Sequence, residues 1–269
     1  MPGASRGLAL RARVVQGPGR LSGPPRLVRR RLDQLLVERG LFASREQAKR
    51  AVMAGWIQVD GERRDKPGTA VNAAAAIEVR GRAEPYVSRG GRKLEQALGV
   101  FDVDPTDAVC LDVGASTGGF TDCLLAHGAA RVYAVDVGYG QLDAGLRSDP
   151  RVVVMERINA RHLPSDALPE PCRVATVDVS FISVVKVAPA LLPHLAPGAD
   201  LLVLIKPQFE VGRGQVGKGG VVRDDELRRE IAARRIAELG ALGLEFRASV
   251  DCDLRGPAGN REIFAHFRT

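Results

Sequence analysis

The stretch Val109-Cys110-Leu111-Asp112-Val113-Gly114-Ala115-Ser116-Thr117-Gly118-Gly119-Phe120-Thr121 decides the fold of this chain. Its first residues form an apolar run typical of a buried strand, and the glycines that follow let the backbone turn sharply into a helix. A helix that starts at such a turn offers unpaired N–H groups and the positive end of its dipole to a ligand. The stretch therefore predicts a site for a nucleotide-like cofactor, although an ordinary strand-to-helix turn would also use glycines.

The spacing of the glycines helps to distinguish between cofactors. Dinucleotide-binding turns follow G-x-G-x-x-G, whereas here Ala115 and Ser116 follow Gly114 and the next glycines are the pair Gly118-Gly119. Asp112, before the first glycine, would repel a pyrophosphate and attract an ammonium group. S-adenosylmethionine carries an amino-acid tail and meets this requirement. We expect it to contact these residues of the stretch: Asp112, Gly114, Ser116, Thr117, Gly118, Gly119 and Phe120.

Further apolar runs indicate a parallel sheet around this turn. They lie at residues 131–136, 152–155, 174–178 and 201–206, with helical intervals between them. Continuous hydrophobicity is typical of parallel strands that are covered on both faces. We therefore predict an α/β domain of Rossmann-like, doubly wound architecture over residues 88–269, with its ligand at the carboxyl ends of the strands.

Polar residues follow these runs where a ligand would bind. Asp136 stands where nucleotide-binding α/β folds hold a ribose diol, although an aspartate there can also cap a helix. With Val137 it is expected to contact the cofactor. Asn159 and Ala160 are expected beside the adenine, although Asn159 can equally cap the next segment. The alternation over residues 262–267 predicts an antiparallel edge strand added to the mostly parallel sheet.

Length and residue types exclude several classes of protein. A chain of 269 residues, 45% of them hydrophobic, accommodates one large domain and one small one. No run approaches the roughly 18 apolar residues that span a bilayer, so we expect no stable membrane insertion. The four cysteines are scattered and the four histidines lack metal-ligand spacing, which predicts a reduced, cytoplasmic protein without a metal site.

Positive charge is concentrated at the amino-terminal end of the chain. Residues 1–31 hold eight arginines and no acidic residue, residues 32–93 carry a net charge of +4, and residues 94–269 carry −5. This asymmetry favours a part that binds a polyanion beside a catalytic part. RNA is the expected partner, and an anionic membrane surface is the rival. Residues 1–28 form a basic extension that we expect to be disordered; a transit peptide or an overextended reading frame would have the same composition.

A compact basic unit is predicted over residues 29–81, with residues 82–87 as the linker to the catalytic domain. Leucines at helical spacing precede Gly40, and a capping box formed by Ser44 and Gln47 begins a second helix. Asp60-Gly61 marks a tight hairpin between short strands. The unit is therefore of the α+β class.

The motifs of this unit resemble those of the S4 RNA-binding domain. They are L-D-x-L-L, then S-R-x-x-A, then V-x-V-D-G, then K-P, in that order. The resemblance implies RNA binding, and we expect contacts to RNA phosphates from four basic residues: Arg29, Arg31, Arg45 and Lys66. A solvated helical face is the alternative, above all for Lys49.

Two lysines and two carboxylates could perform chemistry on an RNA ribose. A ribose hydroxyl is a poor acid, so methyl transfer to it needs a base, and a lysine serves only when its amine is neutral. Lys206 follows a strongly apolar run, and Lys93 could be the second cation that favours the neutral form. Asp178 and Glu262 would orient the two amines.

The motifs of the larger domain resemble those of the TlyA family. They begin at Asp112, Asp136, Asp178, Lys206 and Gly256 and read DVGASTGGFT, DVGYGQL, DVSFIS, KPQFE and GPAGNRE. Members are described as S-adenosylmethionine-dependent ribosomal RNA 2′-O-methyltransferases that act on cytidines, and some are also labelled hemolysins. The Lys-Asp-Lys-Glu tetrad of related ribose methyltransferases falls here on Lys93, Asp178, Lys206 and Glu262. The extension before Arg29 is a departure from the family.

The resemblance implies a cytoplasmic enzyme whose partners are S-adenosylmethionine and the RNA of ribosomal subunits, 23S, 16S or both. A noncatalytic RNA-binding or assembly factor is the first alternative, and the complete tetrad argues against it. A membrane-active hemolysin is the second, and the lack of an apolar span argues against it. A methyltransferase for a base or a small molecule would need neither two lysines nor an S4-like unit.

Overall fold

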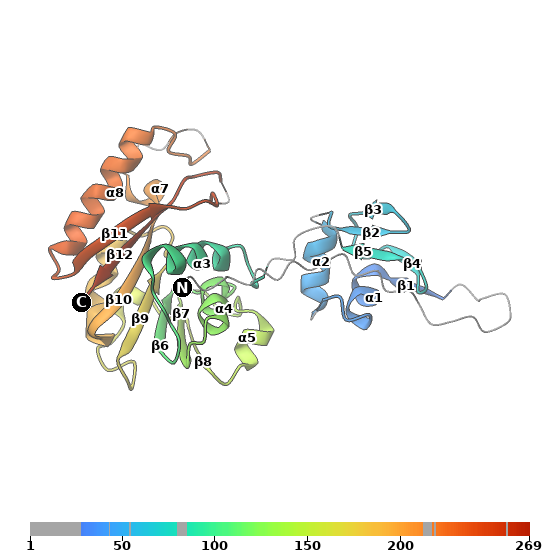
Figure 1. The fold of residues 1–269 in the computed structure, drawn as a ribbon, viewed down its shortest axis with the longest axis horizontal. Helices are drawn as coiled ribbons and strands as arrows, with labels where there is room; N and C mark the ends of the chain where they lie inside the picture. The colour runs from blue at the N-terminus through green and yellow to red at the C-terminus, as the bar shows by residue number, and fades with distance from the viewer. Residues whose placement is uncertain are drawn as a thin grey trace, which may run out of the picture. The chain divides into compact units, whose positions relative to one another are not determined.

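The computed structural model of the chain describes residues 28–42, 44–53, 55–79, 85–211, 217, 219–256 and 258–269. Its internal contacts divide the chain into two compact units, Met1–Ala83 and Glu84–Thr269 (Figure 1). The predicted basic extension lies outside the described residues except for Val28. Within the predicted linker, Tyr86 belongs to the apolar core of the larger unit, and the backbone N–H of Val87 donates to Asp122 there.

The larger unit is built on a seven-stranded sheet in the order β11-β12-β10-β9-β6-β7-β8. Its strands are β6 (Val109–Val113), β7 (Arg131–Asp136), β8 (Val152–Glu156), β9 (Cys172–Val177), β10 (Leu195–Ile205), β11 (Glu245–Asp251) and β12 (Ile263–Arg268). The strands from β10 to β8 in this order run parallel. Each of them contains one of the apolar runs, so the predicted mostly parallel sheet is confirmed.

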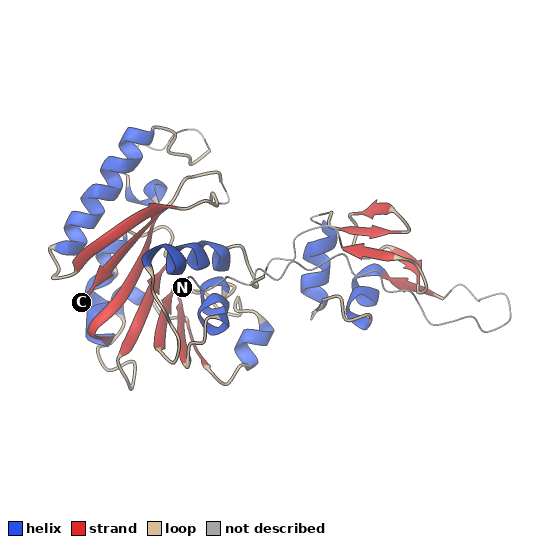
Figure 2. Cartoon of the chain, in the orientation of Figure 1, coloured by secondary structure: helices blue, strands red, loops and turns tan. Residues whose placement is uncertain are grey.

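Helices lie on both sides of this sheet (Figure 2), and an apolar core fills the space between helices and strands on each face. On one face pack the helices α3 (Gly90–Phe101), α4 (Gly119–Ala126) and α5 (Ala144–Ser148), and on the other α6 (Ala188–Leu191) and α8 (Asp225–Gly240). Neighbouring residues of β6 alternate between them, with Cys110 in the first core and Leu111 in the second. The predicted doubly wound architecture is therefore confirmed.

The antiparallel strand predicted over residues 262–267 exists as β12, but the edge strand is β11, which runs in the same direction as the parallel strands. β12 pairs antiparallel with β10 on one side and with β11 on the other, so it lies one place inside the edge. β12 is buried along almost its whole length, as an interior strand is, whereas β11 is mostly exposed. An exposed edge strand carries no apolar run, which is why the sequence does not predict β11.

The smaller unit joins two short helices to two small sheets. The helices are α1 (Leu32–Glu38) and α2 (Arg45–Met53); the strand β1 (Arg29–Arg31) pairs with β4 (Ala70–Asn72), and β2 (Ile57–Val59) lies between β3 (Glu62–Arg64) and β5 (Ile77–Val79). Buried residues of both helices and of β2 form one core. Asp60 and Gly61 have φ of 52° and 82°, which confirms the predicted hairpin turn.

Candidate functional site

Two cavities meet at the glycine turn of the larger unit. The first has a volume of about 280 Å³ and the second of about 370 Å³. Gly114, Ser116 and Asp178 line both of them. Because the turn follows β6, the cavities lie at the carboxyl edge of the parallel strands, where doubly wound sheets bind their ligands.

Glycine is needed at positions 114 and 118 of this turn for two different structural reasons. Gly114 has a φ of 86°, and a Cβ there would lie 2.4 Å from the carbonyl oxygen of Asp178. Gly118 has a φ of 95° and precedes α4, but it packs against Leu146 and does not line either cavity. The turn therefore needs Gly114 for close approach to the next strand end and Gly118 for the entry into the helix. The predicted cofactor contact of Gly118 is not borne out by its position.

All members of the predicted tetrad line the first cavity. Lys93 comes from the first turn of α3, Asp178 follows β9, Lys206 follows β10 and Glu262 precedes β12. Nζ of Lys93 forms an ion pair with Glu262, and Nζ of Lys206 forms one with Asp178. In the first pair the side chain of Lys93 is 10% exposed and that of Glu262 2%. In the second pair Lys206 is 12% exposed and Asp178 23%. Charges this far from water need such partners, so each lysine depends on its carboxylate.

Neighbouring residues fix the two ion pairs in place. Nζ of Lys206 also donates to Oγ of Ser180, over 3.1 Å. A Cβ on Gly256 would lie 2.6 Å from Oε1 of Glu262, so a larger residue at position 256 would displace this carboxylate. This close approach explains why the GPAGNRE motif begins with a glycine.

Glu210 is a buried residue near the site that the sequence analysis did not single out. It ends α7 (Pro207–Glu210), the short helix directly after Lys206. Oε1 accepts the backbone N–H of Val184 over 2.9 Å, and Oε2 lies 3.0 Å from Nε of Arg235 on α8. Burial raises the pKa of this carboxyl, and its hydrogen bonds oppose the rise. Glu210 ties the segment after Lys206 to the segment that follows Asp178.

The second cavity contains the residues predicted to hold the ribose and the adenine: Asp136, Val137, Asn159 and Ala160. Oδ2 of Asp136 accepts the backbone N–H of Ser116 over 2.8 Å, which joins the end of β7 to the glycine turn. Asp136 does not cap α5, because Asp143 does so. The helix-cap alternative for Asp136 is therefore wrong.

Asn159 caps a helix and also lines the second cavity, so neither of its predicted roles is excluded. Its side-chain oxygen accepts the backbone N–H of Arg161 over 3.1 Å and caps the 3₁₀ helix Ala160–His162. The same residue lines the second cavity. Capping holds this segment at the edge of the cavity, so the structural role does not exclude contact with a ligand.

Asp112 does not reach either cavity, which corrects its predicted contact with an ammonium group. Its side chain is fully buried, with Oδ2 accepting from Thr121 over 2.7 Å and Oδ1 from Thr176 over 3.0 Å. Thr121 lies on α4 and Thr176 is the partner of Asp112 on β9. Because neighbouring strand residues point to opposite faces, Asp112 is directed beneath α4, where it joins the helix to two strands.

Several residues that line the cavities had no role predicted from the sequence. Ser88, Arg89 and Gly90 line the first cavity, directly before Lys93 on the chain. Phe181 lines the second; it is 89% exposed, has a φ of 64° and packs against the ring of Phe209, with centroids 4.7 Å apart. An exposed aromatic ring in a left-handed backbone is a signal that only the structure reveals.

The basic residues of the smaller unit divide into two kinds. Nε of Arg31 and Nε of Arg45 lie 3.1 and 2.9 Å from the carboxylate of Asp33, which is fully buried. Burial raises the pKa of Asp33, but the hydrogen bonds from both arginines outweigh it and hold the pKa below its usual value. Arg29 and Lys66 are exposed and form no ion pair within the described residues. Arg31 and Arg45 are therefore structural, whether or not they also contact RNA.

In the part of the chain that the structure describes, no helix is long and apolar enough to cross a membrane. Residues 86–269 match the FtsJ-like methyltransferase family, and residues 30–77 match the S4 domain. The chain is 49% identical to the 16S/23S rRNA (cytidine-2′-O)-methyltransferase TlyA of Mycobacterium tuberculosis. The 245 aligned residues cover 90% of each protein. The chain belongs to the TlyA family.

Further relatives of this TlyA-family protein carry the hemolysin name. Hemolysin A of Brachyspira hyodysenteriae is 42% identical over 241 residues, which cover 88% of this chain and 99% of that protein. A solved structure of a candidate hemolysin from Streptococcus thermophilus has a TM-score of 0.70 and 42% identity, over 90% of this chain and 89% of that one. The predicted family, the Rossmann-like methyltransferase fold and the S4 domain are thus confirmed, and the protein is a methyltransferase.

Replacing Asp112 by asparagine tests the environment of the buried carboxyl. Burial raises the pKa of Asp112 to about 6, against hydrogen bonds from Thr121 and Thr176 that lower it. The folded state then holds a proton that the unfolded state loses above its pKa of 3.8, so stability falls as the pH rises. We expect wild type to lose roughly 1 kcal/mol of unfolding free energy relative to Asp112→Asn between pH 5 and 7.5, measured by urea denaturation. Equal losses in both proteins would contradict the raised pKa.

The two kinds of basic residue in the S4 domain predict different variant effects. Arg45→Ala leaves buried Asp33 with one partner, and we expect it to lower the stability of this domain by about 1–3 kcal/mol. Arg29→Ala and Lys66→Ala should leave stability unchanged and weaken RNA binding, each with a salt slope shallower by about 1. Lys49→Ala is the control, because Lys49 pairs with Glu46 on the same helix. Filter binding at several salt concentrations measures the slopes, and slopes equal to that of the control would argue against both contacts.

Proposed function

We propose that this protein transfers a methyl group from S-adenosylmethionine to the ribose 2′-hydroxyl of a cytidine in ribosomal RNA, 16S, 23S or both. The observation that carries the proposal is the cavity that holds Lys93, Asp178, Lys206 and Glu262 beside the glycine turn. The relative from Mycobacterium tuberculosis, named as an enzyme of this specificity, supports the choice of substrate. Because ribosomal subunits are cytoplasmic in bacteria, we place this activity in the cytoplasm.

The two cavities fit the two ends of S-adenosylmethionine. The second cavity offers the Asp136 carboxylate for a ribose diol and apolar walls, among them Ile158 and Ile182, for an adenine ring. The first cavity is lined by the start of α4, whose backbone N–H groups would receive the carboxylate of the amino-acid tail. When bound, S-adenosylmethionine supplies an electrophilic methyl group on a positively charged sulfur. Asp178, which lines both cavities, would lie near that charge.

Within this arrangement Lys206 is the base. Nζ of Lys206 would accept the proton of the ribose 2′-hydroxyl after releasing the proton that it holds in the ion pair with Asp178, and the ribose oxygen would then take the methyl group that S-adenosylmethionine supplies. Asp178 and Ser180 fix the direction of this amine through the contacts described above. Lys93, held by Glu262, adds positive charge where the ribose oxygen becomes electron-rich.

Replacing the base separates chemistry from cofactor binding. We expect Lys206→Ala to lower methyl transfer to ribosomal subunits by at least about 100-fold, because a positioned base contributes a factor of this order. Binding of S-adenosylmethionine, measured by calorimetry, should remain. Lys186→Ala is the control, since Lys186 is exposed and lines neither cavity. Turnover of Lys206→Ala near that of wild type would show that another group accepts the proton.

The modified position tests the proposed product. After incubation of ribosomal subunits with the protein and labelled S-adenosylmethionine, a 2′-O-methyl group protects the adjacent phosphodiester from alkaline cleavage. We expect protection at cytidines, present with wild type and absent with Lys206→Ala. A label that stays on the base, with every phosphodiester still cleaved, would reject ribose as the acceptor.

A further inference from the structure

A third cavity lies at the start of α8 and shares no lining residue with the other two. Its volume is about 490 Å³. Four arginines line it: Arg223, Arg228, Arg255 and Arg261. Arginine forks bind phosphate oxygens through paired hydrogen bonds, so this arginine cavity has the side chains of an anion site.

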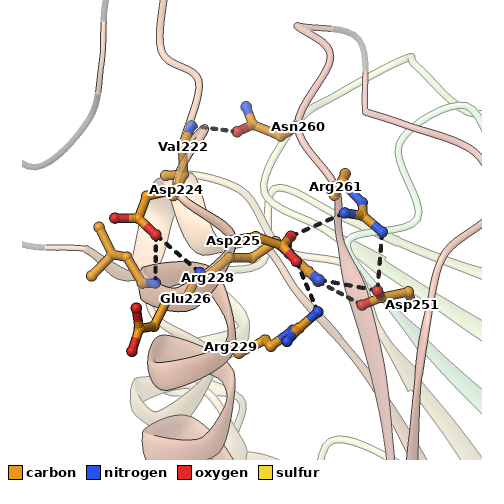
Figure 3. A network of polar contacts seen from close by, with 10 residues as sticks. Val222, Asp224, Asp225, Glu226, Arg228, Arg229, Asp251, Asn260 and Arg261 are labelled. Atoms are coloured by element: carbon orange, nitrogen blue, oxygen red, sulfur yellow. Dashed lines mark hydrogen bonds and ion pairs between the residues drawn. The ribbon is translucent and has the colours of Figure 1, made fainter.

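A network of ion pairs and hydrogen bonds forms a frame around part of the arginine cavity, as Figure 3 shows. Arg228 is buried; its Nη1 and Nη2 donate to Asp251 on β11 over 2.5 and 3.0 Å, and its Nε donates to Asp225 over 2.8 Å. Arg261 donates to the same Asp225 over 3.0 Å. These contacts join α8 to the sheet edge and to the segment before β12. Asp225 also pairs with Arg229, so the two aspartates compensate most of the charge of these three arginines, and the contacts hold the walls together.

Asn260 connects the remaining wall to this frame. Its side-chain oxygen accepts the backbone N–H of Val222 over 2.9 Å (Figure 3), and its nitrogen donates to the carbonyl of Gly220 over 2.9 Å. Asn260 is 2% exposed, so both bonds are shielded from water. The segment that carries Arg223 is therefore fixed to the segment that carries Arg255 and Arg261.

The remaining arginines leave the cavity with surplus positive charge. Arg223 and Arg255 are exposed, and neither forms an ion pair within the described residues. The nearby Asp224 directs its carboxylate to the backbone N–H groups of Glu226 and Leu227, over 2.9 and 3.1 Å, as the cap of α8. The cap already uses the helix terminus, so the arginines are the groups that remain for an anion.

The arginine cavity is connected directly to the catalytic residues. Arg261 precedes Glu262 in the chain, and the backbone N–H of Cys252 donates to the carbonyl of Glu262 over 2.9 Å. One hairpin segment, from Cys252 to Glu262, therefore holds a tetrad carboxylate at one end and contributes Arg255 and Arg261 to the cavity. A ligand that fills both places is a chain with repeated phosphates, which describes RNA.

We propose that the arginine cavity binds a backbone phosphate of the RNA strand whose ribose is methylated, through Arg223 and Arg255. This inference rests on the proposed function and adds a second RNA contact, on the catalytic domain, to that of the S4 domain. It gives the catalytic domain, which has a negative net charge, a local site for a polyanion.

The test compares two double variants of the full-length protein. Arg223→Gln/Arg255→Gln removes two charges from the cavity, and Arg234→Gln/Arg247→Gln removes two from exposed positions of the same domain outside it. With purified ribosomal subunits as substrate, we expect the cavity variant to raise KM about tenfold with kcat little changed. The dependence of log(kcat/KM) on log[KCl] should become shallower by about 1, the amount expected for one lost phosphate contact. Restoring the charges as Arg223→Lys/Arg255→Lys should recover most of the slope.

Each outcome of this comparison decides one point. Equal KM and equal salt slope in the two double variants would overturn the proposal while the methyltransferase assignment stands. Failure of wild type itself to methylate the subunits would instead reject the proposed function. A further arm measures the melting temperature in millimolar inorganic phosphate. Stabilisation that only the cavity variant loses, combined with unchanged KM, would identify a small-anion site and would also overturn the proposal. Unchanged S-adenosylmethionine binding shows that the cavity variant is folded.

Discussion

In this protein two lysines occupy one cavity, and each lies against a carboxylate that keeps its charge compensated. Two unpaired ammonium groups could not be buried together, because repulsion and the loss of hydration would both act against them. The pairs link four separate elements, from α3 to the segment before β12. The proposed catalytic arrangement therefore exists only when the whole sheet has formed, with the strand ends in register.

Buried ties behind the cavities keep those strand ends in register. Asp112 holds α4 to β6 and β9, and Glu210 joins the segment after β10 to the one that follows Asp178. Both carboxyls have a pKa raised by burial. An apolar side chain could also pack at either position. It could not accept the directed hydrogen bonds that the carboxylates accept. We interpret them as the polar contacts that select one arrangement of neighbouring loops.

The two units differ in charge, in agreement with a proposed division between RNA binding in the S4 domain and methyl transfer in the larger domain. The S4 domain carries exposed basic residues such as Arg29 and Lys66, whereas the methyltransferase domain has an excess of acidic residues overall. Phosphate contacts on the first domain would supply affinity that does not depend on the RNA sequence. The arginine cavity would add a local contact near the reacting ribose, where it can orient the strand without making the whole domain basic.

The sequence by itself determined the parallel strands, the glycine turn and the S4 domain, and its resemblance to ribose methyltransferases named four residues that the structure places in one cavity. These features follow from local signals: apolar runs, glycine spacing, and motifs whose residues are close together in the chain. Only the tertiary structure decided that Asp112 lies beneath a helix, that β11 and not β12 is the edge, and that Asp33 holds Arg31 and Arg45. The direction of a polar side chain and the partner of a charge depend on which distant elements pack against them. Local sequence does not contain that information, and so the arginine cavity, which draws on segments about 30 residues apart, appears only in the folded chain.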